Sequence, residues 1–203
     1  MMKIGLTGPS GAGKSTVAEL LIRWGIPSLD TDAIYHELLL PPSSCLDELV
    51  TAFGTGILTS DGHLNRPALA SLVFDPRHAE RLDTLNRITH YYILEQVRIR
   101  CDAYEAQNVP AVLIDAPVLF ESGFDKECDR TLAVLAAPEV RLSRIMDRDG
   151  LSHDAATKRM EAQPTDDFYT TRADAVVYNN GDVTPEVAAT RIRNQLLAWG
   201  VTI

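Results

Sequence analysis

The segment most informative about the fold is Gly8-Pro9-Ser10-Gly11-Ala12-Gly13-Lys14-Ser15. It fits the phosphate-loop pattern G-x-x-x-x-G-K-[ST]. Its glycines permit turns that a Cβ atom would obstruct, so that successive backbone N–H groups can face a phosphate chain. Lys14 can then reach the β- and γ-phosphates, and the Ser15 hydroxyl can bind Mg²⁺. The pattern therefore predicts a site for a nucleoside triphosphate and its magnesium ion.

The segments on both sides of this loop support that prediction. The apolar run Ile4–Leu6 before it indicates a short buried strand, and Thr16–Arg23 after it indicates a helix. The N-terminus of that helix would add its partial positive charge to the phosphate site. A glycine-rich turn without function is the alternative, and the order of strand, loop and helix argues against it.

Composition narrows the class of protein. The 203 residues suffice for one domain with an insertion, and 45% hydrophobic with 23% charged residues is ordinary for a globular protein. The net charge of −9 argues against broad nucleic-acid binding, and no apolar run approaches the length of a membrane span. Three cysteines without C-x-x-C spacing indicate neither a disulfide framework nor a zinc site. We expect a cytoplasmic enzyme with a small-molecule partner, either a monomer or a weak homo-oligomer.

Two carboxylates follow the second predicted strand. The short apolar stretch Ile26–Leu29 stops at Asp30-Thr31-Asp32, which completes a βαβ unit and predicts a parallel sheet. Ligands bind at the carboxyl ends of the strands in such sheets, and the phosphate loop lies at the same edge. One aspartate can cap the helix that begins near Ala33, and capping needs only one. Asp32 is therefore predicted to orient an attacking hydroxyl and to accept its proton.

Three further apolar runs predict strands at residues 111–114, 131–136 and 175–178. Alternating with helices, the five strands predict an α/β fold of the P-loop NTPase kind, similar to nucleotide kinases, with a five-stranded parallel sheet flanked by helices. The third strand ends in Asp115, which has the form of a Walker B carboxylate delivered to Mg²⁺. A cap of a turn or helix is the alternative role for Asp115.

The segment between the second and third strands is too long for a simple crossover. Its pattern is helical, and we expect a helical substrate-binding insertion over about residues 46–107. The core would then comprise about 1–45, 108–139 and 170–203. A long helix is expected to begin at Asp75-Pro76 and to carry His90. His90 could contact a ligand, although residues of the aromatic stretch 90–92 more often pack against neighbours.

A basic cluster follows the fourth predicted strand. Arg141, Arg144 and Arg148 recur at i, i+3 and i+7 on an amphipathic helix, and Arg159 comes further on. We expect a helical lid over about residues 140–165 that places guanidinium groups over the transferring phosphoryl group. A solvated charged face without function is the alternative.

Taken together, these motifs resemble those of the dephospho-CoA kinase family nearly from end to end. The matching stretches, in order, are Gly5-Leu6-Thr7-Gly8, Gly11-Ala12-Gly13-Lys14-Ser15-Thr16, Asp30-Thr31-Asp32, Asp115-Ala116-Pro117-Val118-Leu119-Phe120-Glu121, Arg144, Arg148-Asp149, Arg159-x-x-x-Gln163, Ala173-Asp174 and Asn179-Asn180-Gly181. The order and spacing of these stretches carry the resemblance.

The resemblance implies ATP-dependent phosphorylation of the ribose 3′-hydroxyl of dephospho-CoA, which gives coenzyme A and ADP in the last step of coenzyme A biosynthesis. It implies catalytic roles for Asp32, Lys14 and Arg144, with Asp32 as the base. The residues implied to bind ATP are Gly11, Ala12, Gly13, Lys14, Ser15, Thr16, Arg144, Arg148 and Asn179. Those implied to bind the substrate are Asp32, His90, Pro117, Leu119 and Arg159, and the implied ligands of Mg²⁺ are Ser15 and Asp115.

Three positions depart from the family pattern, and one of them, Val118 in place of a leucine, is a conservative change in a packing position. Tyr91 follows His90 where the family usually has a proline, and Tyr169 stands near the position of a common lysine. If that lysine neutralises phosphate charge in relatives, another group must do so in this chain.

Two other functions share part of the pattern. Another small-molecule or nucleoside monophosphate kinase would have the same fold and loop with a different acceptor. A nucleotide-switch protein that binds GTP is the second alternative, but the chain has no N-K-x-D guanine motif. Its one D-x-x-G string, Asp147–Gly150, follows a predicted helix instead of a buried strand.

Overall fold

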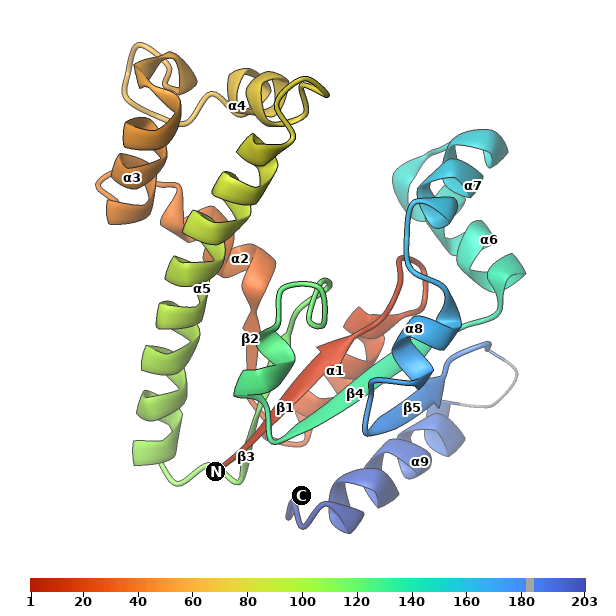
Figure 1. Cartoon of the computed structure of the whole chain (residues 1–203). Coiled ribbons are helices and arrows are strands. Elements are labelled where there is room, and N and C mark those ends of the chain that lie inside the picture. Colours follow the sequence, from red (N-terminus) through yellow and green to blue (C-terminus); the bar gives the residue numbers. More distant parts are fainter. Residues whose placement is uncertain (182–184) are drawn as a thin grey trace. The chain divides into compact units, whose positions relative to one another are not determined.

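The chain folds as two units, which are described here from a computed structural model (Figure 1). The first unit contains Met1–Leu29 and Ala103–Ile203, and the second contains Asp30–Asp102. The structure describes residues 1–181 and 185–203. Residues 182–184, which fall within the expected core segment 170–203, lie outside the described residues.

The first unit is built on a five-stranded parallel sheet with the strand order β2-β3-β1-β4-β5. The strands are Met2–Thr7 (β1), Ser28–Asp30 (β2), Ala111–Asp115 (β3), Arg130–Leu135 (β4) and Ala175–Tyr178 (β5). The central strand β1 pairs with β3 on one side and β4 on the other. All five strands lie where the sequence predicts them, with small shifts at their ends, which confirms the predicted α/β fold.

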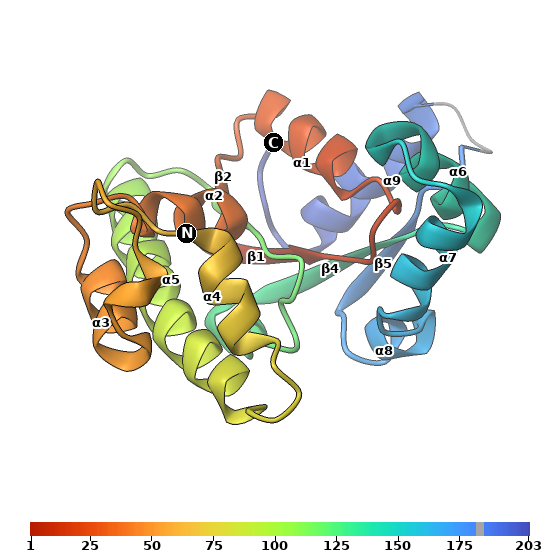
Figure 2. The same cartoon turned by 90° about the horizontal axis from the view of Figure 1, so that it is seen from above.

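Side chains of β4 alternate between two buried faces of the sheet. Leu132 and Val134 pack in one cluster with residues of α1 (Lys14–Arg23) and α9 (Pro185–Ala198). Ala133 and Leu135 pack in another with Tyr169 of α8 (Asp166–Thr170). Figure 2 shows α1 and α9 on one side of the sheet and α8 on the other. Because successive residues of a strand face opposite sides, this alternation explains why residues 132–135 of β4 are all apolar.

Two helices follow β4 and cover the expected lid segment 140–165. These are α6 (Pro138–Asp149) and α7 (His153–Glu161). Pro138 stands in the first turn of α6, and Gly150 ends the helix in a left-handed conformation with φ of 65°. The N–H of Ala137, which precedes α6, donates to Asn180 at 2.8 Å, so the start of α6 is fixed to the segment after β5. A short 3₁₀ helix, η2 (Phe124–Glu127), lies between β3 and β4.

The second unit is helical. It contains α2 (Thr31–Leu38), α3 (Ser44–Phe53), the 3₁₀ helix η1 (Thr55–Ile57), α4 (Arg66–Val73) and most of α5 (Glu80–Ala106). Its core includes Leu39, Cys45, Leu49, Ile57, Leu69, Val73 and Ile88. The unit begins at Asp30, before the segment 46–107 expected from the sequence, because α2 follows β2 directly and belongs to the helical unit.

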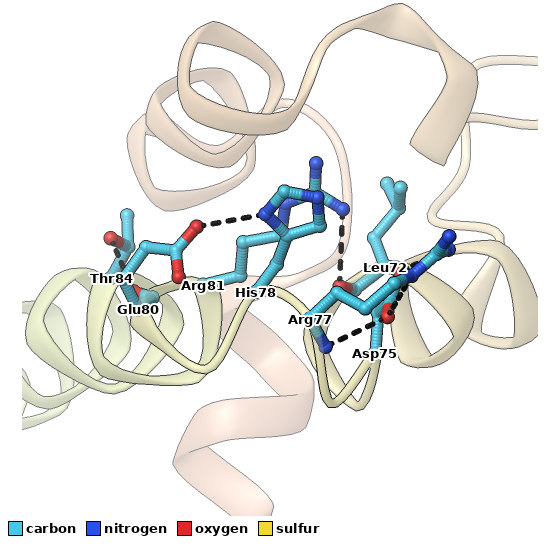
Figure 3. A network of polar contacts seen from close by, with 7 residues as sticks. All are labelled: Leu72, Asp75, Arg77, His78, Glu80, Arg81 and Thr84. Atoms are coloured by element: carbon cyan, nitrogen blue, oxygen red, sulfur yellow. Dashed lines mark hydrogen bonds and ion pairs between the residues drawn. The ribbon is translucent and has the colours of Figure 1, made fainter.

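The long helix α5 begins at Glu80, so the prediction that it begins at Asp75-Pro76 was wrong. Figure 3 shows the polar network that forms a turn there instead. The carboxylate of Asp75 accepts from the backbone N–H of Arg77 at 3.0 Å and from its guanidinium at 2.8 Å. These hydrogen bonds lower the pKa of Asp75 to about 2. An aspartate that bonds to the backbone two residues further on favours a turn over a helix.

Burial differs among the apolar side chains of α9 and among the three cysteines. On α9, Ile192 and Leu196 are buried, and Val187 is exposed. Cys45 and Cys101 are buried and Cys128 is partly buried, and none of the three forms a disulfide.

None of the described helices combines the length and the apolar character that crossing a membrane requires.

Candidate active site

The phosphate loop connects β1 to α1 and requires glycine for two separate reasons. Gly8 and Gly13 have φ of 142° and 90°, which side chains rarely adopt. They also lack space: a Cβ atom on Gly8 would lie 2.1 Å from the carbonyl oxygen of Val134, and one on Gly13 would lie 2.0 Å from Nδ2 of Asn179. The loop therefore packs directly on β4 and on the segment that follows β5.

The first turn of α1 presents backbone N–H groups suited to an anion. Gly13 precedes the helix, and within the described part of the chain no side chain caps this turn and no acidic residue lies in it. The first N–H groups of a helix have no acceptor inside the helix, and the helix dipole adds partial positive charge there. Ser15 and Thr16 in this turn are exposed. This is the arrangement found where helices bind phosphate.

Two predicted ATP-binding residues hold the carbonyl groups of the loop from outside. Nη1 of Arg144 donates to the carbonyl oxygens of Gly11 and Ala12 at 3.2 and 3.4 Å. Nδ2 of Asn179 donates to the same oxygen of Ala12 at 3.1 Å. In a trans peptide the carbonyl and the following N–H point in opposite directions. These bonds therefore direct the N–H of Gly13 away from α6, on the side where a phosphate chain would lie.

Lys14 and Asp115 form an ion pair within the first unit. Asp115 ends β3 and lies opposite Leu6 of the adjacent strand β1. Their side chains are only 18% and 13% exposed, so the contact is largely shielded from water. The pairing places the Walker B candidate directly beside the lysine of the loop.

The residues that could hold Mg²⁺ are Ser15 and Asp115. Mg²⁺ prefers oxygen ligands and is commonly held by one or two protein groups, with substrate phosphates and water as the others. No cluster of three or more His, Cys, Asp or Glu side chains suited to a metal occurs in the parts of the chain that the structure describes. The hydroxyl and the carboxylate fit a magnesium ion shared with a nucleotide, and they do not form a complete metal site alone.

Arg148 and Arg159 share one carboxylate beside the loop. Asp149 accepts from Arg148 at 2.9 Å and from Arg159 at 2.7 Å. Arg148 also donates to the hydroxyl of Ser10 at 3.2 Å. The hydrogen bonds from Arg148 lower the pKa of Asp149, and Asp149 raises the pKa of Arg148. The predicted lid segment thus holds charged guanidinium groups at the tip of the phosphate loop.

Arg141 differs from the other members of the stripe, because its residue is only 5% exposed. The alternative of a solvated charged face is therefore wrong for this position. The sequence assigns no separate role to Arg141 or to Gln163, and the structure brings both to Ser10. The only signal for them was the i, i+3 spacing from Arg144 and the R-x-x-x-Q spacing from Arg159.

Pro117 and Leu119 lie in the segment after β3. The Pro117 carbonyl accepts from the Thr7 hydroxyl at 3.2 Å. Leu119 is fully buried and packs closely against Gly5, so the structure explains it as a packing residue, and its contact with a substrate stays a prediction. Tyr169, near the family's lysine position, is 2% exposed, and burial raises its pKa to about 12. It therefore stays neutral and supplies no positive charge.

In the second unit, the aspartate that ends β2 and the aspartate in the first turn of α2 have different surroundings. Asp30 caps α2 by accepting from the N–H groups of Asp32 and Ala33 at 2.9 and 3.2 Å. Asp32 lies exposed in the first turn of the helix. One turn further along, His36 is hydrogen-bonded through Nδ1 to Arg66 at 2.8 Å, a pair that the sequence analysis missed. The i, i+4 spacing of Asp32 and His36 places them on one face of α2.

The second unit also contains a cavity and the remaining predicted residue. The cavity has a volume of about 330 Å³ and is lined by residues of α2, α3 and α5, among them Glu37, Tyr92 and the ion-pair partner of Glu37, Arg100. His90 is half-buried on α5, and burial lowers its pKa. Its contact with a substrate stays a prediction.

The structure thus gathers most of the predicted site residues in one unit. The loop residues Gly11–Thr16, with Asp115, Arg144, Arg148, Arg159 and Asn179, lie in the first unit and contact one another directly or through Ser10 and Asp149. Asp32 and His90 belong to the second unit. The approach of Asp32 to the γ-phosphate therefore stays a prediction from the sequence.

Known proteins are similar to this chain over most of its length. A family model described as dephospho-CoA kinase matches residues 2–185. Among curated proteins, the dephospho-CoA kinases of Moorella thermoacetica and Corynebacterium efficiens are 41% and 40% identical, over 94% and 90% of this chain and 90% of each relative. A crystal structure of a Thermus thermophilus protein has a TM-score of 0.79 at 34% identity and covers 97% of this chain and 96% of its own. A Bacteroides thetaiotaomicron shikimate kinase, with a TM-score of 0.54 and 16% identity over 96% of this chain and 98% of its own, shares the fold alone.

Proposed function

The chain belongs to the dephospho-CoA kinase family, and from that premise we propose which of its residues carry out the reaction. The family catalyses the last step of coenzyme A biosynthesis, in which ATP phosphorylates dephospho-CoA. The ribose 3′-hydroxyl is the acceptor, and coenzyme A and ADP are the products. We place this activity in the cytoplasm, in a protein that works as a monomer or a weak homo-oligomer.

The observation that carries the proposal is the arrangement of the loop around Lys14. The carbonyls of Gly11 and Ala12 are held outward, and Lys14 is the cation beside the first turn of α1. Among the residues that the structure describes, none caps that turn with its side chain. A phosphate chain bound there would accept from N–H groups and from Lys14 together. Such preorganised donors stabilise charge on the transferring phosphoryl group without reorganising during the reaction.

Mg²⁺ would be held by Ser15 and Asp115 together with the phosphates. When bound, it neutralises charge on the β- and γ-phosphate oxygens. In the structure Lys14 is paired with Asp115. Binding of a nucleotide would give Lys14 phosphate oxygens as new partners and leave the Asp115 carboxylate for the metal.

Asp32 is the proposed base. The transition state of phosphoryl transfer is loose, so a base contributes mainly by holding the acceptor hydroxyl in line and taking its proton late. Asp32 is exposed, and its neighbour Asp30 already caps the helix, so no capping role competes for its carboxylate. His90, Pro117, Leu119 and Arg159 are the further proposed contacts of dephospho-CoA.

Arg144 and Arg148 are the proposed lid residues for ATP. Both guanidinium groups already contact the loop, Arg144 at Gly11 and Arg148 at Ser10. A short displacement would let them donate to phosphate oxygens, and closure of α6 and α7 would keep water from competing with the acceptor. Because Tyr169 is neutral and buried, these arginines would replace the charge of the family's lysine.

The test is the release of ADP from ATP and Mg²⁺ with each of several acceptors. Dephospho-CoA is compared with adenosine, AMP, shikimate and no acceptor, and the product is identified by mass. Turnover with dephospho-CoA alone, with formation of coenzyme A, is the expected result. Turnover with another acceptor would support the kinase activity and contradict the assignment of dephospho-CoA as the substrate. Tight binding of GTP without any turnover would favour a nucleotide switch.

A further inference from the structure

The tip of the phosphate loop is bound on both sides of one residue, Ser10. Its N–H donates to Oε1 of Gln163 at 3.0 Å, and its carbonyl accepts from Nε of Arg141 at 3.0 Å. Nη2 of Arg141 also donates to the same oxygen of Gln163 at 3.2 Å. Ser10, Arg141 and Gln163 therefore form a closed hydrogen-bonded ring that joins the loop to α6 and to the segment after α7.

Close packing accompanies these bonds. A Cβ atom on Gly11, the next residue of the loop, would lie 2.6 Å from the carbonyl oxygen of Arg141. The loop thus rests on the first turns of α6 at its backbone as well as through side chains. A shift of the Arg141 side chain cannot occur without changing what the Ser10 carbonyl contacts.

Burying the guanidinium of Arg141 costs free energy of desolvation that a purely structural role does not require. Its side chain is 7% exposed, and Asp166, its acidic partner, is 3.6 Å away and itself 44% exposed. Burial lowers the pKa of Arg141, which means that the charged form is less stable here than in water. Apolar residues of similar volume often replace buried charged groups without loss of stability. The hydrogen bond to the phosphate loop therefore explains the charge of Arg141 better than packing in the core does.

That requirement follows from the geometry of the Ser10–Gly11 peptide. The carbonyl of Ser10 and the N–H of Gly11 belong to one trans peptide and point in opposite directions. We propose that Arg141 and Gln163 are positioning residues that fix this peptide, so that the N–H of Gly11 faces the phosphates of the nucleotide. Asn179 and Arg144 fix the Ala12–Gly13 peptide in the same way, through its carbonyl oxygen. Arg141 adds the corresponding contact at the tip of the loop.

The inference rests on the proposed nucleotide site and is independent of the acceptor. The probe is therefore ADP with Mg²⁺, titrated calorimetrically into the folded protein, which reports affinity and stoichiometry separately. Arg141→Ala removes the charged donor and is expected to raise the Kd of ADP about tenfold at unchanged stoichiometry. Arg23→Ala, which removes an exposed arginine from the last turn of α1, is the matched control and should leave the Kd within about twofold.

Variants of Gln163 test the ring while the buried charge of Arg141 is kept. Gln163→Leu removes the acceptor for both Ser10 and Arg141 and is expected to raise the Kd of ADP about fivefold. Gln163→Glu keeps an acceptor for both and should restore the affinity to within about twofold of the unchanged protein. Because the two residues act on one peptide, the double variant of Arg141→Ala with Gln163→Leu should bind only slightly more weakly than Arg141→Ala alone.

The possible outcomes separate positioning from plain stability. The proposal is supported if Arg141→Ala and Gln163→Leu raise the Kd of ADP at full stoichiometry while Gln163→Glu does not. An unchanged Kd in Arg141→Ala overturns it. A lowered stoichiometry with an unchanged Kd in the folded fraction assigns Arg141 to stability alone and also overturns it. If Arg141→Ala does not fold, Gln163→Leu and Gln163→Glu decide the question. A failure to phosphorylate dephospho-CoA would leave these ADP titrations unaffected.

Discussion

The two units of this chain specify their functional residues in different ways. In the first unit, side chains predicted to bind ATP are fixed by hydrogen bonds to the backbone of the phosphate loop, as Arg144 and Asn179 are. In the second, Asp32 is exposed on a helix whose cap is another residue, Asp30. Phosphates are common to all nucleotides and can be bound by backbone groups in a fixed arrangement. An acceptor is particular to one enzyme, and its contacts follow no general motif.

The largest effect should come from removing the cation of the loop. Lys14→Ala is expected to lower kcat/KM with dephospho-CoA by about 10³-fold, because a preorganised charge at the phosphates is lost. It would also leave the shielded carboxylate of Asp115 without the lysine. Steady-state turnover checks this, with Lys126→Ala, an exposed lysine of the first unit, as the matched control. Activity of Lys14→Ala within about tenfold of the unchanged protein would remove Lys14 from the mechanism.

The next largest effect tests the second unit. Asp32→Asn should lower turnover by about 10²-fold or more while the affinity for ADP stays nearly the same, because the carboxylate acts on the acceptor hydroxyl. Asp30→Asn makes the same charge change two residues away, and asparagine caps helices as well as aspartate does. Its turnover should stay within about threefold. Equal losses in both variants would mean that the charge of the segment matters and that Asp32 is not a specific base.

A third prediction concerns the packing of the loop on the sheet. Gly8→Ala should destabilise the protein by about 3 kcal/mol, because a Cβ atom would collide with the backbone of Val134 in addition to adopting an unfavourable φ. Gly25 has a φ of 84°, and within the described part of the chain no atom beyond its own and its two neighbours' lies within 4 Å of the added Cβ, so Gly25→Ala should cost only about 1 kcal/mol. Urea unfolding measures both free energies. Equal losses would show that close packing at Gly8 contributes nothing beyond backbone strain.

The smallest effect lies in the turn between α4 and α5. The folded state lowers the pKa of Asp75 from 3.8 to about 2, through its hydrogen bonds to Arg77. The ionised carboxylate therefore stabilises the folded state above pH 3.8, and this contribution is lost as the pH falls toward 2. Asp75→Asn should be slightly less stable than the unchanged protein at pH 5, and the difference should shrink as the pH is lowered. The effect is small because the Arg77 side chain of the pair is exposed to solvent.

Urea unfolding at a series of pH values measures this difference. Arg77→Ala removes the guanidinium donor and should reduce the same pH-dependent part of the free energy of unfolding, while the backbone N–H of residue 77 still donates to Asp75. A difference between Asp75→Asn and the unchanged protein that grows toward low pH would contradict the assignment.

The sequence sufficed for most of the fold because its signals were local. The loop, the strands and the cap of α2 each depend on residues within a few positions of one another. The predicted start of α5 was wrong because a hydrogen-bonded turn at Asp75 competes with the helix. Arg141 and the pair of His36 and Arg66 were missed because their partners lie far along the chain, 131 residues away for Ser10 and 30 for Arg66. Such contacts depend on tertiary structure, which periodicity and spacing do not encode.

The most direct test of the central claim is to determine where the phosphoryl group is attached. Dephospho-CoA, ATP and Mg²⁺ would be incubated with the protein, and the product examined by phosphorus NMR and mass spectrometry. The account predicts one new phosphomonoester on the ribose 3′-oxygen, in a product identical to coenzyme A, formed in equal amount with ADP. A phosphate at another position, or ADP and free phosphate with dephospho-CoA unchanged, would contradict it.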